Sequence, residues 1–405
     1  MNVLDATAYL NLDPEAFRDP RPLFDALRGQ PTIHLDPATG FHLVADPDTV
    51  RSVLQDSDTF SSADAFSPAL TESVHFLMGV LTDEQREHFV SPVESIMTSD
   101  GGTHKRLRQA VHAYFTKAAI RRRHSAIRAR AAEVLDGLGT EVDWVQDFCM
   151  PFTVHVIADI LGVPDTDFET IVRWDRLLSA LATGAEVTAD TINTYLEFTR
   201  EFNEYFRERA ASLARNPNDS LLSHLVSQGE MLTDHERIQF LLILFPAGSA
   251  STVILLTHIA VRFARQPGLM RELRAAPETI PSFVEDSVVE RTPSANIFRT
   301  ATREVTLQGT SIPAGSVLLL LLAAANRGIP SQASHLAFGY GIHRCLGAEL
   351  ARAEGLAALE EILARYQSLT LTQPLDSLRI HPHLLIPSHP QLPVSLERAG
   401  QRTSP

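Results

Sequence analysis

The sequence HLAFGYGIHRCLGAEL, residues 335–350, decides the fold of this chain. It places Cys345 in a loop whose glycines remove side-chain bulk on both sides of the sulfur; these are Gly339, Gly341 and Gly347. Such a loop lets the backbone approach a flat ligand and direct amide N–H groups at the sulfur. The following residues are rich in Ala, Leu and Glu with apolar residues at helical spacing, so a helix is expected from about Leu346. The dipole of that helix would stabilise a thiolate at its N-terminus.

The run F-G-x-G-x-H-x-C-L-G, residues 338–347, resembles the haem-binding loop of the cytochrome P-450 family. The resemblance implies that Cys345 is the axial ligand to the iron of haem b (iron protoporphyrin IX). It further implies contacts to this cofactor from Phe338, Gly339, His343 and Gly347. A buried structural cysteine is the alternative, but it leaves the glycines and His343 without a role.

Helical patterns dominate the rest of the chain, and strand-like segments are few. The main expected helices are 22–29, 48–56, 104–138, 151–161, 189–215, 234–266 and 347–366. The expected strands are 33–35, 41–44, 305–307, 317–322 and a final pair, 383–386 and 394–396, around a proline-rich turn. The resemblance extends in family order over nearly the whole chain, from 13–28 to the C-terminal hairpin. It implies a mainly α (α+β) fold, a helix-rich triangular prism with a small β-region.

Residues 1–397 are expected to form a single domain, and residues 398–405 a disordered tail. Two segments have mixed character. Residues 61–101 are apolar in places but lack a steady period, as is typical of a long binding loop. Residues 163–188 are expected to form a helix pair with exposed ends.

Composition excludes several classes of function. A formal net charge of −14 argues against a nucleic-acid partner and against an anionic membrane surface. The two cysteines, Cys149 and Cys345, are too few for a disulfide framework and suit a reducing compartment. The longest apolar run, 312–325, is interrupted and too short to span a bilayer, and no signal or anchor is expected at the N-terminus. A cytoplasmic protein is therefore expected.

Four basic residues are candidates for binding the two carboxylates of haem, which must be neutralised in an apolar slot. His104 and Arg108 are four residues apart and share a helical face. Arg299 opens a strand pair, and His343 lies two residues before Cys345. The family places a His-x-x-x-Arg helix, a sheet arginine and a loop histidine on the haem propionates, so the resemblance assigns this role to all four. A solvated helix face is the alternative for His104 and Arg108.

The central helix departs from the family pattern. The family's Ala-Gly-x-Asp/Glu-Thr-Thr carries an acid and an alcohol that supply protons for oxygen activation, but residues 247–252 read Ala-Gly-Ser-Ala-Ser-Thr. Ala247 and Gly248 are expected to border the oxygen-binding groove, with simple close packing of the helix as the alternative. Ser251 takes the alcohol position and, with Thr252, is a candidate catalytic residue. Because Ala250 replaces the acid, water or substrate would have to resupply the proton.

A second departure lies behind the cysteine loop. The family's Glu-x-x-Arg falls on residues 286–289, Asp-Ser-Val-Val, so the arginine is absent and the glutamate is shortened to Asp286. The segment 326–335 is shorter than the family's meander, which normally adds an arginine to the same ion-pair network. With both arginines gone, this region is expected to be more apolar and the loop less firmly braced. Glu349 and Arg352 are expected to form an ordinary surface pair.

Three functions remain open. The first is a haem-thiolate monooxygenase, an oxidoreductase that acts on a small or mid-sized apolar substrate in specialised metabolism. Its electrons would come from NAD(P)H through a ferredoxin and a ferredoxin reductase, because the chain has no dinucleotide fingerprint. The second is a haem enzyme that uses peroxide or catalyses coupling, dehydration or rearrangement. The third is a haem-poor partner that activates another enzyme, such as a glycosyltransferase.

Some residues are not interpreted as functional. His381, His383 and His389 lie among prolines in an expected hairpin, which favours a surface or pocket-lining role over a metal site. Cys149 is expected to be a small buried apolar residue.

Overall fold

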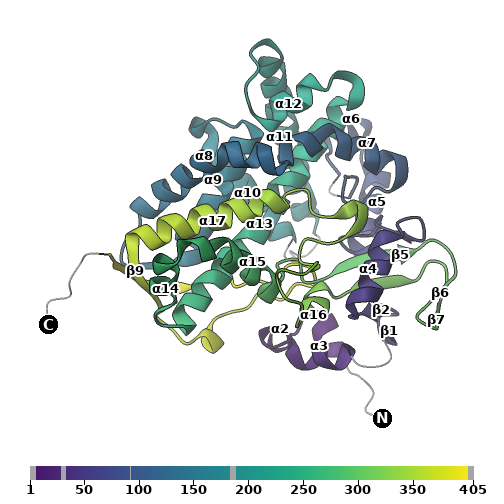
Figure 1. The fold of residues 1–405 in the computed structure, drawn as a ribbon. Coiled ribbons are helices and arrows are strands. Elements are labelled where there is room, and N and C mark those ends of the chain that lie inside the picture. Colours follow the sequence, from purple (N-terminus) through teal and green to yellow (C-terminus); the bar gives the residue numbers. More distant parts are fainter. Residues whose placement is uncertain (1–5, 29–32, 92, 183–187, 400–405) are drawn as a thin grey trace.

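The structure is a computed structural model that describes residues 6–28, 33–91, 93–182 and 188–399. Helices make up most of the molecule, and one sheet with its adjoining hairpin lies at one end (Figure 1). The helices are α1 (Thr7–Leu10), α2 (Pro14–Arg18), α3 (Arg21–Leu27), α4 (Pro47–Gln55), α5 (Pro68–Val80), α6 (Asp83–His88), α7 (Gly101–His112), α8 (Lys117–Asp136), α9 (Met150–Leu161), α10 (Phe168–Ala182), α11 (Ala189–Arg215), α12 (Leu221–Ser227), α13 (Asp234–Arg265), α14 (Leu269–Ala275), α15 (Ile280–Arg291), α16 (Leu322–Asn326) and α17 (Ala348–Arg365). The strands are β1 (Ile33–Leu35), β2 (His42–Val44), β3 (Phe60–Ser61), β4 (Glu141–Asp143), β5 (Ile297–Ala301), β6 (Val305–Leu307), β7 (Thr310–Ile312), β8 (Val317–Leu320), β9 (Tyr366–Leu371) and β10 (Pro393–Arg398). The predicted mainly α fold with a small β-region is confirmed.

Helix α13 runs through the core. Thr233 and Glu236 form a capping box at its start, and its apolar residues pack against α9, α15 and α17. By length and composition alone α13 could cross a bilayer, but 61% of its most apolar window is buried, as expected for the core helix of a globular protein. Gly248 permits close packing, because a Cβ there would lie 2.2 Å from Cδ1 of Ile157 on α9.

The larger sheet has the strand order β1-β2-β8-β5-β3. β2 and β8 are parallel, and the other neighbours are antiparallel. Arg299 lies in the middle of β5 and pairs with Leu318 of β8, so its side chain starts from a buried sheet. The predicted strands 33–35, 41–44 and 317–322 correspond closely to β1, β2 and β8. The predicted strand 305–307 is β6, which forms a hairpin with β7.

A second sheet, of order β4-β10-β9, corrects two predictions. Residues 394–396 do lie in a strand, but its partners are β4 and β9. Residues 383–386 form no strand; an isolated bridge joins His381 to Ser388 beside them. Arg398 is the last residue of β10 and donates to the Leu138 carbonyl at 3.2 Å, so the predicted tail does not begin there. Residues 400–405 lie outside the described residues.

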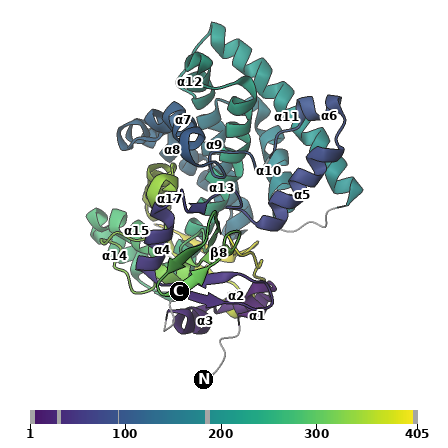
Figure 2. The same cartoon turned by 90° about the vertical axis from the view of Figure 1, so that its right-hand side faces the viewer.

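The segment 61–101 was predicted to be an irregular loop, but it contains two helices, α5 and α6. Both lie beside α11 (Figure 2). Ser67 caps α5, and Thr82 forms a capping box with Gln85 on α6. Val74 is the one fully buried side chain recorded on α5, so the apolar period that would reveal this helix is weak. The segment 163–188 holds a single long helix, α10, instead of the predicted pair; residues 183–187 lie outside the described residues.

The cysteine loop is held against α4 by a glycine. Gly341 has φ +69°, a backbone conformation that L side chains rarely adopt. A Cβ at Gly341 would lie 2.2 Å from the carbonyl oxygen of Leu54 on α4. The backbone of the loop therefore touches the backbone of α4, and this contact requires glycine.

Substitution of Gly341 tests this contact. Gly341→Ala should lower the free energy of unfolding by more than Gly315→Ala, because Gly315 has φ +79° but no atom within 4 Å of its ideal Cβ. Both variants carry the backbone strain of about 1–2 kcal/mol, and the clash at Gly341 should add about 1–3 kcal/mol. Chemical denaturation of the two variants measures the difference, and equal losses would show that the approach to α4 is not tight.

Candidate active site

Cys345 follows the short 3-10 turn Gly341–His343 and precedes α17, which begins at Ala348, two residues later than expected. Its N–H donates to the Phe338 carbonyl at 2.8 Å, which closes the loop. The residue retains accessible surface although protein surrounds it, so the sulfur borders an internal space. Burial raises the pKa of the Cys345 thiol, while the Gly347 N–H and the charge of Arg108 oppose that shift.

The four predicted basic residues come together beside this loop. The rings of His104 on α7 and His343 are 4.3 Å apart between centroids, and Arg108 donates to the Arg344 carbonyl at 2.8 Å. Arg299 reaches the same region from β5; its side chain is 4% exposed and donates to the Phe298 carbonyl at 2.7 Å. Three separate elements thus place their basic groups around one space.

Burial shifts the proton equilibria of these groups toward their neutral forms. It lowers the pKa of His104 to about 4, assisted by the charges of His343 and Arg108. It lowers the pKa of Arg299 to about 10, against the attraction of Asp100. The buried Nε2 of His104 has no hydrogen-bond partner among the described residues. Buried donors without acceptors cost free energy, so this set of residues suits a ligand that brings anionic oxygens.

Asp100 was not identified from the sequence. Its carboxylate accepts hydrogen bonds from the hydroxyls of Ser61 and Ser62, at 2.7 Å each, and lies 3.0 Å from Nε2 of His343. Burial alone would raise its pKa, but these hydrogen bonds hold that pKa well below the usual range. Asp100 orients His343, and its position just before α7, four residues ahead of His104, is the signal that sequence reasoning could have used.

The central helix α13 presents two different faces. Residues 240, 247 and 251 share one face by helical spacing, and Ala247 on it is exposed. Ser251 donates back to the Ala247 carbonyl at 3.2 Å. Gly248 and Thr252 share another face: Gly248 packs against α9, and Thr252 Oγ1 donates to Glu354 of α17 at 2.8 Å. Close packing therefore accounts for Gly248, whereas Ala247 and Ser251 remain on the accessible side.

Two buried acids flank α13, although its own acid is replaced by Ala250. Glu354 is 0% exposed, its Oε1 has no hydrogen-bond partner among the described residues, and burial raises its pKa to about 8. Asp175 on α10 accepts a hydrogen bond from Ser249 at 3.0 Å, and burial raises its pKa to about 6. These acids bond to Thr252 and Ser249, whereas Ser251 donates to the Ala247 carbonyl, so the expectation that water or substrate resupplies a proton at Ser251 stays a prediction.

A cavity of about 440 Å³ lies between α5, residues 93–99, α7 and the start of α13. His75, Leu107 and Phe240 contribute to its wall from the three helices, together with Glu94 and Ile96. Phe240 lies on the same face of α13 as Ala247, and Leu107 lies on α7 between His104 and Arg108. The four basic residues are not themselves part of the cavity's described lining.

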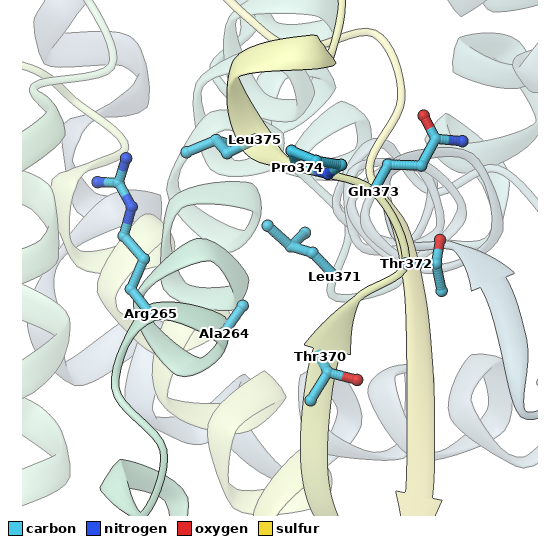
Figure 3. Close-up of a pocket in the computed structure, with 8 residues that line it drawn as sticks. All are labelled: Ala264, Arg265, Thr370, Leu371, Thr372, Gln373, Pro374 and Leu375. Atoms are coloured by element: carbon cyan, nitrogen blue, oxygen red, sulfur yellow. The ribbon is translucent and has the colours of Figure 1, made fainter.

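A second hollow, of about 380 Å³, lies where the end of α13 meets β9 and the loop that follows it (Figure 3). Cys345 is not part of its described lining. Its described lining includes one titratable side chain, Arg265, and no candidate catalytic residue. We do not assign it to the active site.

The region behind the cysteine loop contradicts the expectation of an apolar site. Glu285 on α15 pairs with Arg352 of α17 and contacts His335 in the loop, and Asp286 accepts a hydrogen bond from Ser331. Arg352 does contact Glu349 as predicted, at 3.0 Å, but the pair is not an ordinary surface pair. The cause is the position of Glu285, which lies 67 residues before Arg352 in the chain and beside it in space.

One residue that we set aside, Cys149, agrees with its assignment. Cys149 is fully buried. The described ranges include His381, His383 and His389. Within these ranges there is no group of three or more His, Cys, Asp or Glu side chains that could hold a metal.

Comparison with known proteins identifies the class. The chain is 32% identical over 338 residues to mycinamicin IV hydroxylase/epoxidase of Micromonospora griseorubida, covering 77% of this chain and 82% of that protein. It is 29% identical over 347 residues to erythromycin C-12 hydroxylase of Saccharopolyspora erythraea, covering 82% and 83%. A solved structure of a mutant of P-450 EryK in complex with erythromycin B superposes with a TM-score of 0.79 at 27% identity, covering 97% and 99%. No family model matches the chain.

The fold and these relatives define an oxidoreductase of the monooxygenase class. The chain belongs to the cytochrome P-450 family. Its relatives are bacterial hydroxylases and epoxidases, and it is a monooxygenase of specialised metabolism.

The buried acid Glu354 predicts a distinctive pH dependence. Its carboxyl ionises near pH 8 when folded but near pH 4.5 when unfolded, so between these values the folded state binds the extra proton. The free energy of unfolding therefore falls as the pH rises through this window, by up to about 1.4 kcal/mol per pH unit. Glu354→Gln should flatten that slope.

Denaturation at pH 5, 6.5 and 8 measures the slope. Glu272→Gln, which alters an exposed carboxylate on α14, serves as the control and should leave the slope unchanged. A Glu354→Gln protein with the wild-type slope would contradict a raised pKa at this position.

Proposed function

We propose that the protein is a haem-thiolate monooxygenase in which Cys345 is the axial ligand of haem b. The observation that carries this assignment is the arrangement at the internal space: one cysteine sulfur, closed backbone around it, and basic side chains converging from α7, β5 and the loop. A planar dianionic cofactor satisfies both halves of this arrangement. Its rings need an apolar slot, and its two propionates need the buried donors.

His104, Arg108, Arg299 and His343 would bind the propionates, and the unpartnered Nε2 of His104 would gain an acceptor. The faces of the ring would contact Phe338, Gly339 and Gly347 on the cysteine side and Ala247, with Gly248 behind it, on the α13 side. When bound, the haem iron supplies activation of dioxygen with electrons delivered from outside.

The helix α13 and the helices packed against it would supply protons to the active site. The Ser251 hydroxyl lies on the accessible face of the helix and can donate a hydrogen bond into the active site. Glu354 is protonated near neutral pH and is hydrogen-bonded to Thr252. Thr252 follows Ser251 directly in α13. Thr252 is thus a link between the buried acid and α13, in place of a carboxyl at position 250.

The substrate would occupy the cavity beneath α5 and residues 93–99, against α13. Its volume of about 440 Å³ fits a small or mid-sized apolar molecule. The named relatives act on mycinamicin IV and erythromycin, which supports a product of specialised metabolism. Electrons would come from a ferredoxin and a ferredoxin reductase, and the protein would act in the cytoplasm, a location that its bacterial P-450 relatives support.

Removal of the sulfur tests the assignment. Cys345→Ala should abolish the red-shifted absorption band of the reduced carbon-monoxide complex, because that band requires a thiolate ligand. Cys149→Ala removes the other, fully buried cysteine and should retain the band. A Cys345→Ala protein with an unchanged band would refute the proposed ligand.

A second function is the use of peroxide as the oxidant, which needs neither external electrons nor external protons. One observation favours it: Ala250 stands where the family has an acid. Ser251→Ala distinguishes the two. If dioxygen is the oxidant, this variant should form product per NAD(P)H at least about tenfold less efficiently and keep its peroxide-driven turnover.

Thr257→Ala removes another hydroxyl of the same helix, which donates to the Val253 carbonyl at 2.7 Å, and is the control for Ser251→Ala. A protein that turns over rapidly with peroxide, and for which Ser251→Ala changes neither route, would support the second function.

A further inference from the structure

The cysteine loop is attached from behind to two helices through a single carboxylate. Glu285 of α15 lies 2.7 Å from Nε2 of His335, which opens the loop, and 2.7 Å from Nε of Arg352 on α17, which follows the loop. The side chain of His335 is 7% exposed and that of Glu285 19%, so the contacts are largely shielded from water. One carboxylate therefore contacts the chain on both sides of Cys345.

The hydrogen bonds around His335 define its tautomer. Its Nδ1 accepts the N–H of Ala337 at 3.2 Å, so the ring proton of the neutral form lies on Nε2. That Nε2–H donates to Glu285 without any need for a charged imidazole. One ring nitrogen of His335 is thus bonded to the loop backbone at Ala337, and the other is bonded to Glu285 on α15.

Arg352 carries the contact forward to the residue that closes the cysteine loop. Its guanidinium lies 4.4 Å from the centroid of the Phe338 ring, a cation–π distance. The Phe338 carbonyl accepts the N–H of Cys345 at 2.8 Å. An unbroken series of contacts therefore runs from Glu285 through Arg352 and Phe338 to the backbone of Cys345.

We propose that Glu285, His335 and Arg352 are positioning residues that hold Cys345 at the height and orientation its ligand requires. This inference rests on the proposed role of Cys345 as the haem ligand. The three residues take over from the Glu-x-x-Arg network, whose arginine position is Val289 here. Asp286, at the position of the network's glutamate, turns instead to Ser331 of the shortened meander.

Charge supports the same conclusion. Burial would raise the pKa of Glu285, but hydrogen bonds from Arg352 and His335 outweigh it and hold the pKa at about 2. The carboxylate is therefore ionised at all physiological pH values. Removing one partner would leave a shielded charge without compensation, and groups that orient a metal ligand in this way affect metal retention as well as stability.

The test uses the purified haem-containing protein and four variants: Glu285→Gln, Arg352→Gln, the double variant Glu285→Gln/Arg352→Gln, and Glu349→Gln. Glu349→Gln removes the other carboxylate partner of Arg352 and leaves the Glu285 contacts in place, so it is the matched control. The readouts are the fraction of the reduced carbon-monoxide complex in the thiolate form and the rate of haem transfer to apomyoglobin.

The first three variants should lose thiolate-form absorption and release haem about tenfold faster, while Glu349→Gln behaves as wild type. His335→Gln, which retains a terminal N–H donor, should be closer to wild type than His335→Ala. If a single variant fails to fold, the double variant decides, because it removes both charges of the shielded Glu285–Arg352 pair.

Wild-type spectra and haem-release rates in the folded double variant would overturn the proposal, even if its unfolding midpoint falls. That result would reduce the three residues to a structural role. Failure of the haem assignment is distinguishable from this result. In that case Cys345→Ala would retain the absorption band of the wild-type protein.

Discussion

The placement of one cysteine sulfur beside an internal space is the constraint on which the rest of the structure depends. A buried loop must satisfy its own backbone donors and acceptors, and here Phe338 and Cys345 do so for each other. The loop must also fit between α4 and α17. At Gly341 its backbone lies so close to α4 that no side chain fits at this position. Packing and hydrogen bonds therefore hold the sulfur in place, and the elements around it are arranged to make that possible.

Electrostatics adds a second demand, since several basic groups are removed from water in the same place. Burial disfavours their charged forms, as the lowered pKa values of His104 and Arg299 show. Asp100 compensates for part of this charge, but it also accepts two serine hydroxyls and contacts His343. The remaining positive potential suits an anionic ligand. Under the proposed assignment the residues that bind the haem are also the residues whose buried charges it would compensate, so cofactor binding would stabilise the fold.

The sequence allowed the fold class, three strands of the larger sheet (β1, β2 and β8) and the cysteine loop to be predicted, because each depends on local pattern. His104 and Arg108 were accessible for the same reason, being four residues apart on one helix. Asp175, Glu354 and Glu285 were not, because each meets its partner across 74, 102 and 67 residues of chain respectively. The strand β9 was hidden because it continues directly from α17 with no breaking residue. Residues 383–386 have strand-like composition, but β10 pairs with β9 and β4 instead.

Both departures from the family pattern follow one physical logic. At position 250 the helix lacks its acid, yet Glu354 and Asp175 approach the same helix from α17 and α10. At position 289 the arginine is missing, yet Arg352 supplies a guanidinium from α17 to a carboxylate one residue away from the usual one. A buried network tolerates the exchange of its members between elements as long as charge and hydrogen bonds remain balanced. Motif positions in one sequence therefore report where a group stands in the chain, whereas the chemistry depends on which groups meet in space.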